Sequence, residues 1–484
     1  MSPSIYKSRV RKKKPILFHR IGALWEILLT SSKLECRGLS EGTGFFYQQR
    51  FAWKTYLLMK SIKPMISIED ARRLVLEHTS RLKSETVQVM KAVGRILAED
   101  VASDINMPPF DKAAMDGYAV RANDVSSASH DAPVCLRVTE DIPAGVAPTT
   151  AISPGTAARI MTGAPLPPGA DAVVMVEVTE RLKDSHVRIC APVQRGQNVC
   201  VLGEDIQIGQ IVLKQGQWIR SQEVGILASV GRTEVSVTVR PEVAILPTGS
   251  EIVEPGQSLA VGQIRNSNGY SLYAQTLAAG ARPRYLGIAD DTRIELKAKV
   301  QDGLKSDVLL LSGGVSMGDY DFVTEALLDI GVEIFFERIQ IKPGKPTVFG
   351  QKDGTLVFGL PGNPVSTVVI FEEFVYPALR KMQGYAELER PMVRAILERS
   401  FRKKPGRRQY APAWTRWTEQ GWTTSPILSH GSADLMSMTH ANSFMVVAEE
   451  LGELETGARV DVRLLDESVF FPEDLARVNG GHQL

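Results

Sequence analysis

Three glycine-bearing loops, each directly behind an apolar run, hold the residue types of this chain best suited to chemistry. They read TGSE, SGGVS and LPGNP. Glycine reaches φ values at which successive backbone N–H groups turn toward an anion, and neighbouring hydroxyls add hydrogen-bond donors. A single loop of this kind indicates a tight turn, whereas three at one sheet edge favour a ligand site. The predicted phosphate cradle consists of Thr248, Gly249, Ser250, Ser312, Gly313, Gly314, Ser316, Pro361, Gly362, Asn363 and Pro364.

Acidic side chains follow the same apolar runs. Carboxylates beside a phosphate cradle suit Mg²⁺, which proteins usually hold with one or two carboxylates plus ligand phosphates. The alternative is that loop aspartates are solvated turn formers or helix caps, and it is strongest for Asp290 and Asp319. The predicted metal ligands are Glu251, Asp290 and Asp321. The whole acidic set is Glu251, Asp290, Asp291, Asp319 and Asp321, with Asp205 of the GED segment preceding the sheet.

Positive charge comes from the segment IKPGKP, residues 341–346, which places Lys342 and Lys345 among two prolines and a glycine. Proline restricts backbone freedom, which favours a fixed anion contact over a solvated lysine pair. The polar loops PGRR and HGSA add Arg407 and Ser432. Arg407 either meets a phosphate bidentately or is a surface charge, and the residues do not decide between the two.

The segment MPPFDKAAMDGYAV, residues 107–120, carries Asp111 and Asp116 and has no hydrophobic period. Core packing explains such a segment poorly. It is expected to be a loop that reaches toward a ligand whose identity the residues do not reveal.

The elements that would position these loops form an α/β alternation. From Arg240 to about residue 386, apolar strands alternate with helical stretches, and right-handed crossovers make the sheet largely parallel. Short strands and turns over 133–201 predict a small β domain, and the segment after Arg390 predicts a small barrel or sandwich. Ser67 is expected to cap a helix over 68–82, and Ser221 a shorter one that Gly231 ends.

The length of 484 residues exceeds one hydrophobic core and predicts a multidomain α/β plus β fold. The central domain is a mostly parallel α/β sheet. The predicted parts are a poorly structured basic extension, 1–64; an N-terminal α+β linker domain, 65–107 plus 206–240; an inserted β domain, 108–205; the α/β domain, 241–386; a C-terminal β-barrel domain, 387–472; and a tail, 473–484.

The net charge of +1 conceals an asymmetry. Residues 1–64 carry 13 Lys/Arg against 3 Asp/Glu, a net of +10, which leaves −9 for the rest. A nucleic-acid or membrane-surface arm is the alternative to a poorly structured extension. No window is apolar enough for a transmembrane helix, and the four cysteines show no zinc spacing.

Together these motifs resemble the molybdopterin molybdenumtransferase family, which contains bacterial MoeA and the E domain of gephyrin. The matching pieces occur in one order over roughly residues 65–470: PPFDKAAMDGYAV, RIMTGAPLPPGADAVVMVE, GEDI, PTGSEI, SGGVSMGDYD, IKPGKP, GLPGNPVS, PGRR and HGSADL. The resemblance implies a four-part subunit with a molybdopterin-binding-like sheet. It also implies a cytoplasmic homodimer that binds adenylylated molybdopterin, molybdate and Mg²⁺, inserts the metal into the pterin dithiolene and releases AMP.

Several residues match family positions. Asp116, Asp205, Glu251, Asp290 and Asp321 match acidic positions tied to metal or catalysis, and Lys342, Lys345, Arg407 and Ser432 match positions tied to substrate or molybdate. The expected catalytic set is Asp116, Asp205, Glu251, Asp321, Lys342 and Lys345. Thr324 and Arg338 depart from lysines found in relatives, and arginine keeps the charge while changing its geometry.

Two other functions stay open on the same fold. A nucleotide or pyrophosphate hydrolase would release AMP without metal uptake, and a gephyrin-like scaffold would bind partners. Expected partners are a molybdopterin adenylyltransferase and molybdoenzyme apoproteins or chaperones, with no nucleic acid and no membrane. The residues do not discriminate molybdenum from tungsten.

Overall fold

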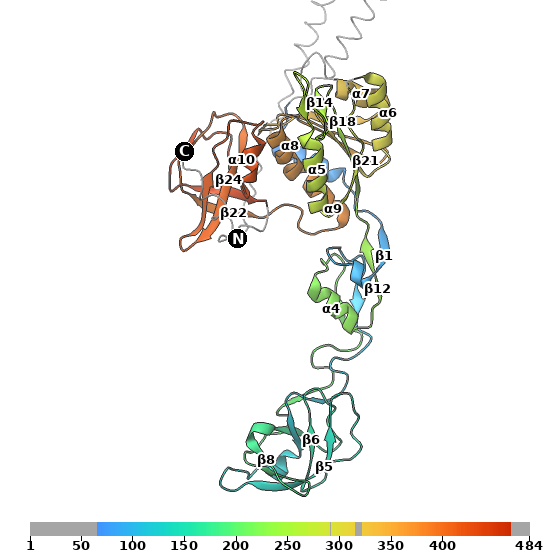
Figure 1. Cartoon of the computed structure of the whole chain (residues 1–484), viewed down its shortest axis with the longest axis vertical. Coiled ribbons are helices and arrows are strands. Elements are labelled where there is room, and N and C mark those ends of the chain that lie inside the picture. Colours follow the sequence, from blue (N-terminus) through green and yellow to red (C-terminus); the bar gives the residue numbers. More distant parts are fainter. Residues whose placement is uncertain (1–64, 291, 315–321, 466–484) are drawn as a thin grey trace, which may run out of the picture. The chain divides into compact units, whose positions relative to one another are not determined.

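The computed structural model describes residues 65–290, 292–314 and 322–465 (Figure 1). Asp291, Ser316, Asp319 and Asp321 therefore lie outside the described residues, as do the predicted extension and tail. Over the described ranges, no helix combines the length and the apolar character that crossing a membrane requires.

The loops predicted to carry chemistry follow strands of one six-stranded sheet in the described part of the chain. Its order is β16-β13-β17-β21-β20-β18. The first four strands are parallel, while β20 is antiparallel to both β21 and β18, so the prediction of a largely parallel sheet is confirmed. The strands are β13 (Glu242–Pro247), β16 (Arg282–Tyr285), β17 (Val308–Ser312), β18 (Glu333–Arg338), β20 (Pro346–Lys352) and β21 (Thr355–Leu360).

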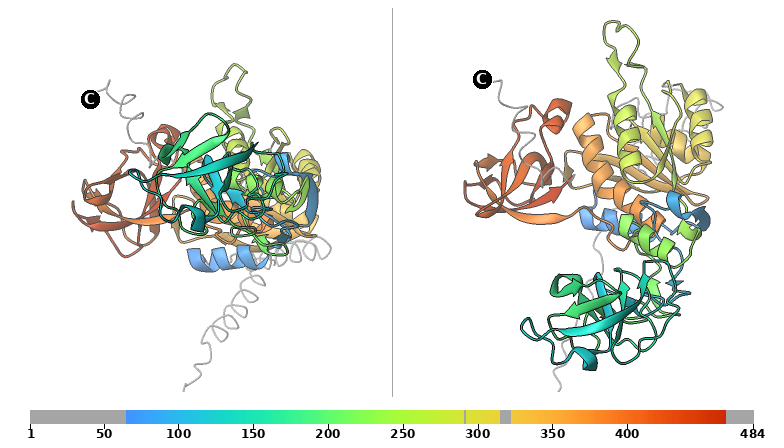
Figure 2. Two further views of the ribbon diagram at one scale, coloured as in Figure 1. Left: turned by 90° about the horizontal axis from the view of Figure 1, so that it is seen from below. Right: turned by 60° about the horizontal axis from the view of Figure 1, so that its bottom comes forward.

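Helices cover both faces of this sheet, as Figures 1 and 2 show. Alternate residues of β13 belong to different cores: Val243 and Ile245 pack with α5, α8 and α9, whereas Ala244 and Leu246 pack with α6 and α7. That period of two is the geometry of a strand buried on both sides. The helices are α5 (Ser267–Ala278), α6 (Arg293–Gly303), α7 (Phe322–Ile330), α8 (Pro364–Ile370), the π-helical η4 (Phe371–Val375) and α9 (Tyr376–Gln383).

The predicted N-terminal helix is α3 (Ile68–Glu77), and the Ser67 hydroxyl accepts from the N–H of Asp70 as its cap. The helix ends five residues before the predicted Leu82, because the N–H of Leu82 donates to the carbonyl of Met382 instead. The second cap prediction was wrong. Arg220 occupies the N-cap position of helix α4 (Ser221–Ser229), and Ser221 is the first residue of the helix.

Helix α4 lies with the short strand pairs β1 (Ser84–Gln88) with β12 (Glu234–Thr238), and β2 (Val101–Ala102) with β11 (Ile211–Leu213). The predicted small β domain is present as a sheet of order β7-β4-β6-β5-β9-β8 among the described residues. Its strands are β4 (Gly117–Val120), β5 (Val134–Ile142), β6 (Thr156–Ile160), β7 (Ala172–Met175), β8 (Thr179–Arg181) and β9 (His186–Ile189), with β3 (Lys112–Ala113) pairing β10 (Val199–Cys200) nearby. Short 3-10 turns are η1 (Val89–Lys91), η2 (Ala122–Val125) and η3 (Val176–Val178).

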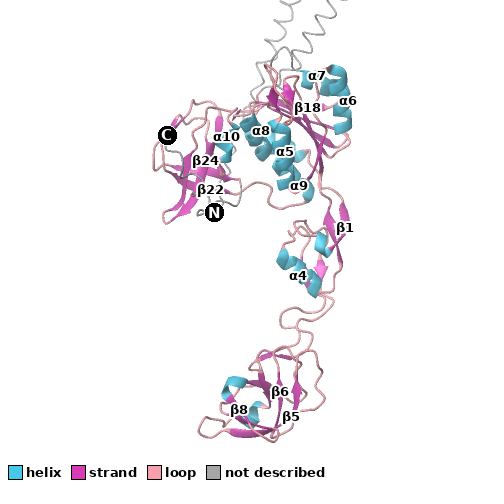
Figure 3. Ribbon diagram, viewed as in Figure 1, coloured by secondary structure: helices cyan, strands magenta, loops and turns pink. Residues whose placement is uncertain are grey.

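The C-terminal part is a closed barrel, and Figure 3 labels its strands β22 and β24. Pairing of β24 with β26 closes the ring β24-β25-β22-β28-β26. The two-residue strand β19 (Ile341–Lys342) comes from the α/β domain yet pairs in parallel with the edge of β24. The bounds are β22 (Met392–Leu397), β23 (Phe401–Arg402), β24 (Arg408–Thr418), β25 (Gly421–Pro426), α10 (Leu435–Thr439), β26 (Ser443–Val447), β27 (Glu453–Leu454) and β28 (Arg459–Leu464).

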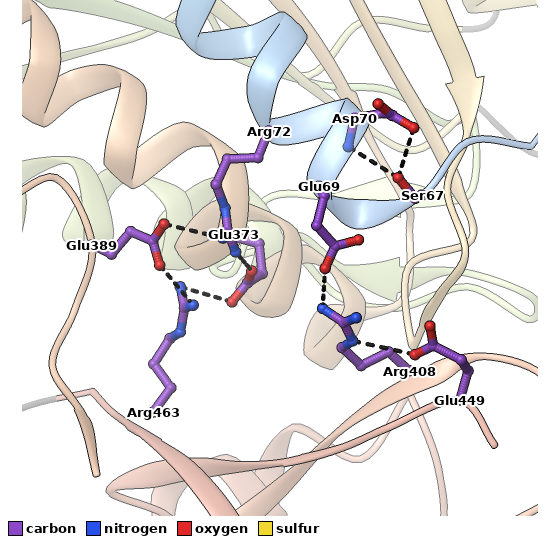
Figure 4. A network of polar contacts seen from close by, with 9 residues as sticks. All are labelled: Ser67, Glu69, Asp70, Arg72, Glu373, Glu389, Arg408, Glu449 and Arg463. Carbon is purple, nitrogen blue, oxygen red and sulfur yellow. Dashed lines mark hydrogen bonds and ion pairs between the residues drawn. The ribbon is translucent and has the colours of Figure 1, made fainter. Parts of the chain in front are cut away.

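Buried charges join the barrel to the α/β domain and to α3 (Figure 4). Glu373 in the π-helical turn pairs with Arg72 at 2.5 Å and with Arg463 at 2.9 Å, and Glu389 pairs with both arginines at 3.0 Å. The side chains of Glu373 and Arg463 are only 1% and 2% exposed. Each charge in this ring has two opposite partners, which offsets the desolvation that a buried ion suffers.

Candidate functional site

Three strand ends bring the glycine-bearing loops together. The N–H of Thr248 donates to the carbonyl of Ser312 at 2.9 Å, and the N–H of Gly313 donates to the carbonyl of Leu360 at 3.1 Å. Thr248 also forms an isolated parallel bridge with Ala289. The loops after β13, β16, β17 and β21 therefore lie side by side at the carboxyl edge of the sheet, the usual ligand edge of open α/β folds.

Glycine is required at two positions of this edge. Gly313 has φ of 100°, and a Cβ there would lie 2.4 Å from the carbonyl oxygen of Thr248. Gly249 has φ of 144°, and its Cβ would lie 2.6 Å from the carboxylate of Glu251. A side chain at either position would be strained by φ and would overlap its neighbour. The close approach of the loops therefore depends on Gly313, whereas at Gly249 the overlap is with the exposed Glu251 side chain of the same loop and φ is the stronger constraint.

Asn268 holds two of the loops together and was not among the predicted site residues. Its amide nitrogen donates to the hydroxyl of Ser312 at 2.9 Å and to the carbonyl of Gly362 at 2.7 Å. The residue lies in the first turn of α5, which Asn266 caps by accepting from the N–H of Gly269. The sequence NSNG carried a cap signal, but nothing in it indicated that the second asparagine spans two loops.

Two of the three predicted metal ligands are described, and their surroundings fit a hard cation. Glu251 and Asp290 are exposed and follow neighbouring strand ends, and Gly249 leaves space that the Glu251 carboxylate fills. Two carboxylates beside a phosphate cradle are the donor set that Mg²⁺ accepts. Among the described residues no group of three or more acidic, histidine or cysteine side chains could hold a metal alone. A cation here would need oxygen atoms of the ligand.

The predicted cations meet at a cavity of about 710 Å³ between the α/β loops and the barrel. From the α/β domain it is lined by Lys342, Lys345, Pro361 and Asn363, and from the barrel by Arg407 and Ser432. The Asn363 amide donates to the Ser432 hydroxyl at 2.8 Å, and the N–H of Val365 donates to the carbonyl of Ser432 at 3.0 Å. These residues are up to 90 positions apart, and β19 brings Lys342 beside the barrel.

Three cations that line the cavity have no carboxylate partner among the described residues. Within the described ranges, no carboxylate lies within 4.0 Å of Lys342, Lys345 or Arg407, although Arg407 donates to the carbonyl of Ile341 at 3.2 Å. Arg402, on the same wall, is paired with Glu453. Burial, and then the charge of Lys342, lower the pKa of Lys403. Three such cations around one cavity predict an anion site.

The HGSA loop takes its shape from Asp434, which was not predicted. Its carboxylate accepts from the N–H groups of His430, at 3.1 Å, and Ser437, at 3.2 Å. The hydrogen bond from the His430 backbone is the largest cause of the lowered pKa of Asp434. Asp434 thus closes the loop that presents Ser432 to the cavity.

The acidic residues of the inserted β domain keep local partners. Asp116 accepts from the N–H and hydroxyl of Thr162, both at 2.7 Å, and these two hydrogen bonds lower its pKa. Asp111 accepts from the N–H of Leu202 at 2.7 Å, and the N–H of Asp205 donates to the carbonyl of Met107. Over the described residues, no hydrogen bond or ion pair joins Asp116 or Asp205 to the loops of the α/β sheet. Their expected catalytic roles stay predictions.

Thr324 lies within α7, and Arg338 ends β18, where its carbonyl accepts from the N–H of Ile66. Neither residue lines the cavity. The two departures from the family pattern therefore leave the lining of the cavity unchanged.

Comparison with known proteins matches three family models in succession. The model described as the MoeA N-terminal region (domain I and II) matches residues 66–231, a probable molybdopterin binding domain matches 244–381, and the MoeA C-terminal region (domain IV) matches 394–465. Together these matches include both walls of the cavity.

Individual relatives are similar over most of the chain. A molybdopterin molybdenumtransferase of Bacillus subtilis (strain 168) is 34% identical over 406 residues, covering 83% of this chain and 94% of that protein. Molybdopterin molybdenumtransferase 2 of Mycobacterium tuberculosis (strain ATCC 25618 / H37Rv) is 37% identical over 409 residues, covering 82% and 99%. The crystal structure of a molybdopterin biosynthesis MoeA protein from Pyrococcus horikoshii OT3 has a TM-score of 0.71 at 31% identity, covering 83% of this chain and all of that one.

Proposed function

The chain belongs to the molybdopterin molybdenumtransferase family, and we propose that it inserts molybdenum into adenylylated molybdopterin in molybdenum cofactor biosynthesis. Molybdate supplies the metal to the dithiolene sulfurs of the pterin. Cleavage of the phosphoanhydride then releases AMP.

The observation that carries this proposal is the cavity between sheet edge and barrel. Lys342, Lys345 and Arg407 line it without carboxylate partners among the described residues, and Asn363 links it to the glycine-bearing loops. Molybdate is a dianion and the second substrate carries a pyrophosphate, so both need cations and N–H donors to approach each other. A site with the cradle on one side and the free cations on the other meets both needs.

Each group has a distinct proposed role. The loops that hold Thr248, Ser312 and Gly362 bind and orient the phosphates, and the two lysines offset negative charge that develops during cleavage. Glu251 and Asp290 would hold Mg²⁺, which polarises the phosphoanhydride when bound. Arg407 and Ser432 bind the oxyanion from the barrel side. Asp116, Asp205 and Asp321 are proposed to complete the acidic set.

The names of the relatives favour this transferase reaction over the hydrolase that the same sheet could support. A homodimer in the cytoplasm, supplied by a molybdopterin adenylyltransferase, is part of the same proposal. So is delivery of the product to molybdoenzyme apoproteins or their chaperones.

The test is incubation of the protein with adenylylated molybdopterin, Mg²⁺ and either molybdate or tungstate. We expect AMP release together with metal bound in the pterin product. AMP without bound metal would identify the hydrolase. Absence of AMP release with both oxyanions would refute the proposed reaction, and a comparison of the two oxyanions would assign the metal.

A further inference from the structure

Arg408 lies on the side of β24 away from the cavity. Its neighbours Arg407 and Gln409 line the cavity, whereas Arg408 pairs with Glu69 of α3 and, at 3.4 Å, with Glu449 (Figure 4). Side chains alternate between the two faces of a strand, so a rotation of β24 that moves Arg408 also moves the neighbouring residues that line the cavity. A contact that fixes Arg408 therefore also fixes the direction of Arg407.

The spacing between Lys342 and Arg407 depends on a very short strand pair. Ile341 pairs with Arg408 and Lys342 pairs with Gln409, and these are the two register pairs between β19 and β24. Arg407 adds a hydrogen bond to the carbonyl of Ile341 at 3.2 Å. A pairing this short specifies the register between β19 and β24 weakly. Contacts from neighbouring elements must therefore help to hold the two strands in this register.

The start of α3 supplies that support from both sides. The N–H of Ile66 donates to the carbonyl of Arg338 at 3.1 Å, and the N–H of Gln340 donates to the carbonyl of Ile66 at 2.9 Å, directly before β19. Three residues further along, the carboxylate of Glu69 binds the guanidinium of Arg408 on β24. Ile66, just before α3, thus bonds to the segment that leads into β19, and Glu69 in the first turn of the helix bonds to β24.

A second anchor prevents α3 from moving with Arg408. Arg72, three residues after Glu69, pairs with the buried Glu373 and with Glu389, which also hold Arg463 of the barrel. The helix is therefore held by a ring of four charges, two of which, Glu373 and Arg463, are buried. Glu69 projects from a rigid support rather than from a mobile surface helix.

From these contacts we propose that Glu69 is a positioning residue for the anion cavity. It acts through Arg408 to hold β24 against β19, and so keeps Arg407 and Lys342 in place on the two walls of the cavity. This inference rests on the proposed function, because the anion it concerns is molybdate.

The two explanations predict opposite changes in molybdate affinity when the charge of Glu69 is removed. Replacing Glu69 with glutamine removes a negative charge near a cationic cavity, and the field alone would then strengthen anion binding. Loss of positioning has the opposite sign, because Arg407 and Lys342 would no longer be held together. The ion pair is partly exposed, so the effect should be moderate, about fivefold.

The experiment measures AMP release at varied molybdate concentration for the full chain and its E69Q variant. We expect the KM for molybdate to rise about fivefold, with kcat at saturating molybdate nearly unchanged. The matched control is D70N, which removes the same charge from the same turn; Asp70 pairs with Ser67 and Arg73 instead of Arg408. D70N should leave the KM for molybdate unaltered.

A double-mutant cycle tests whether Glu69 acts through Arg408. The E69Q/R408Q variant should have the KM of R408Q alone, because the second change removes nothing further. An unchanged or lower KM in E69Q, an equal rise in D70N, or additive effects in the cycle would each overturn the inference while leaving the proposed function intact. An unmodified protein that neither binds molybdate nor releases AMP would overturn both.

Discussion

The amide nitrogen of Asn363 donates to the hydroxyl of Ser432 at 2.8 Å, joining the first turn of α8 to a loop of the barrel. Asn363 occupies the N-cap position of α8, yet its side chain makes no capping hydrogen bond to that helix. A residue type that usually caps is instead used to connect two domains across the anion cavity. Proline at the next position suits the first turn of a helix without such a cap.

Ser432→Ala removes the acceptor of this hydrogen bond. We expect the KM for molybdate to rise about fivefold, since a single hydrogen bond contributes about 1 kcal/mol. The maximal rate of AMP release should change little. Steady-state assays at varied molybdate concentration measure both values. The control is Ser429→Ala, because the Ser429 hydroxyl bonds to Gly431 of its own loop and, among the described residues, makes no hydrogen bond to the α/β domain. Equal effects of the two variants would contradict the role of the interdomain contact.

Lys345→Gln removes one of the cavity cations that has no carboxylate partner over the described ranges. Molybdate binding should weaken about tenfold, or about 1.4 kcal/mol, and the deficit should shrink as ionic strength rises. Isothermal titration with molybdate measures this loss. Arg402→Gln is the matched variant, because Arg402 lines the same cavity but is paired with Glu453. Its affinity should stay within about twofold of the unmodified protein.

Gly313→Ala places a methyl group against the carbonyl of Thr248, 2.4 Å from the predicted Cβ position, at φ of 100°. We expect a loss of about 3 kcal/mol in the free energy of unfolding, from backbone strain and overlap together. Gly145→Ala isolates the strain, because Gly145 has φ of 84° and no atom within 4 Å of its Cβ position. That variant should lose about 1 kcal/mol in urea unfolding. Similar losses for both would argue against close approach of the loops.

Glu373→Ala leaves Arg463, 2% exposed, and Arg72 without their shared buried partner. The free energy of unfolding should fall by about 3 kcal/mol, because the buried Arg463 would keep Glu389, whose side chain is 38% exposed, as its remaining partner among the described residues. Thermal and urea unfolding measure the loss. Glu77→Ala breaks a solvent-exposed pair with Arg73 and should cost less than about 0.5 kcal/mol. A Glu373 variant as stable as the Glu77 variant would show that the ring is not needed for folding.

Hydrogen bonds from the Arg220 side chain lower the pKa of Glu223 to about 2. A carboxyl whose folded pKa is depressed stabilises the fold above its unfolded pKa, near 4.5, and loses that contribution as pH falls toward 2. Glu223→Gln should therefore lower stability by about 1 kcal/mol at pH 7 and by progressively less between pH 4.5 and 2. Melting curves across that range test it. A constant difference between variant and parent would be inconsistent with this titration.

Features that depend on neighbouring residues in the sequence could be predicted, whereas contacts between distant segments could not. Strand-ending glycine loops are local patterns, and the sheet edge was predictable from TGSE, SGGVS and LPGNP. The hairpin of β20 and β21 has an equally local signal in Asp353-Gly354, both at positive φ. The prediction that Ser221 caps α4 was wrong although its signal was local. Serine is a common capping residue, but the N-cap position is occupied by Arg220. Its backbone N–H donates to the carboxylate of Glu223 in the first turn.

The cavity itself could not be derived from patterns. Lys342 and Arg407 are 65 residues apart, and the pairing of β19 with β24 brings their backbones together. Asn268 likewise has the local signature of a helix start, while its partners Ser312 and Gly362 come from two later loops. Such contacts follow from tertiary packing, which single-sequence periodicity does not encode.

Strand β19 belongs by covalent connection to the α/β domain and by hydrogen bonding to the barrel. The two domains are therefore not interchangeable modules. A gene fragment ending before the barrel would encode Lys342 without the strand that orders it, and a barrel expressed alone would expose an unpaired edge at Arg408. Exchange of one domain between relatives would have to carry the matching partner of this edge. The anion cavity is in that sense inherited as a single unit, although its two walls fold as parts of different domains.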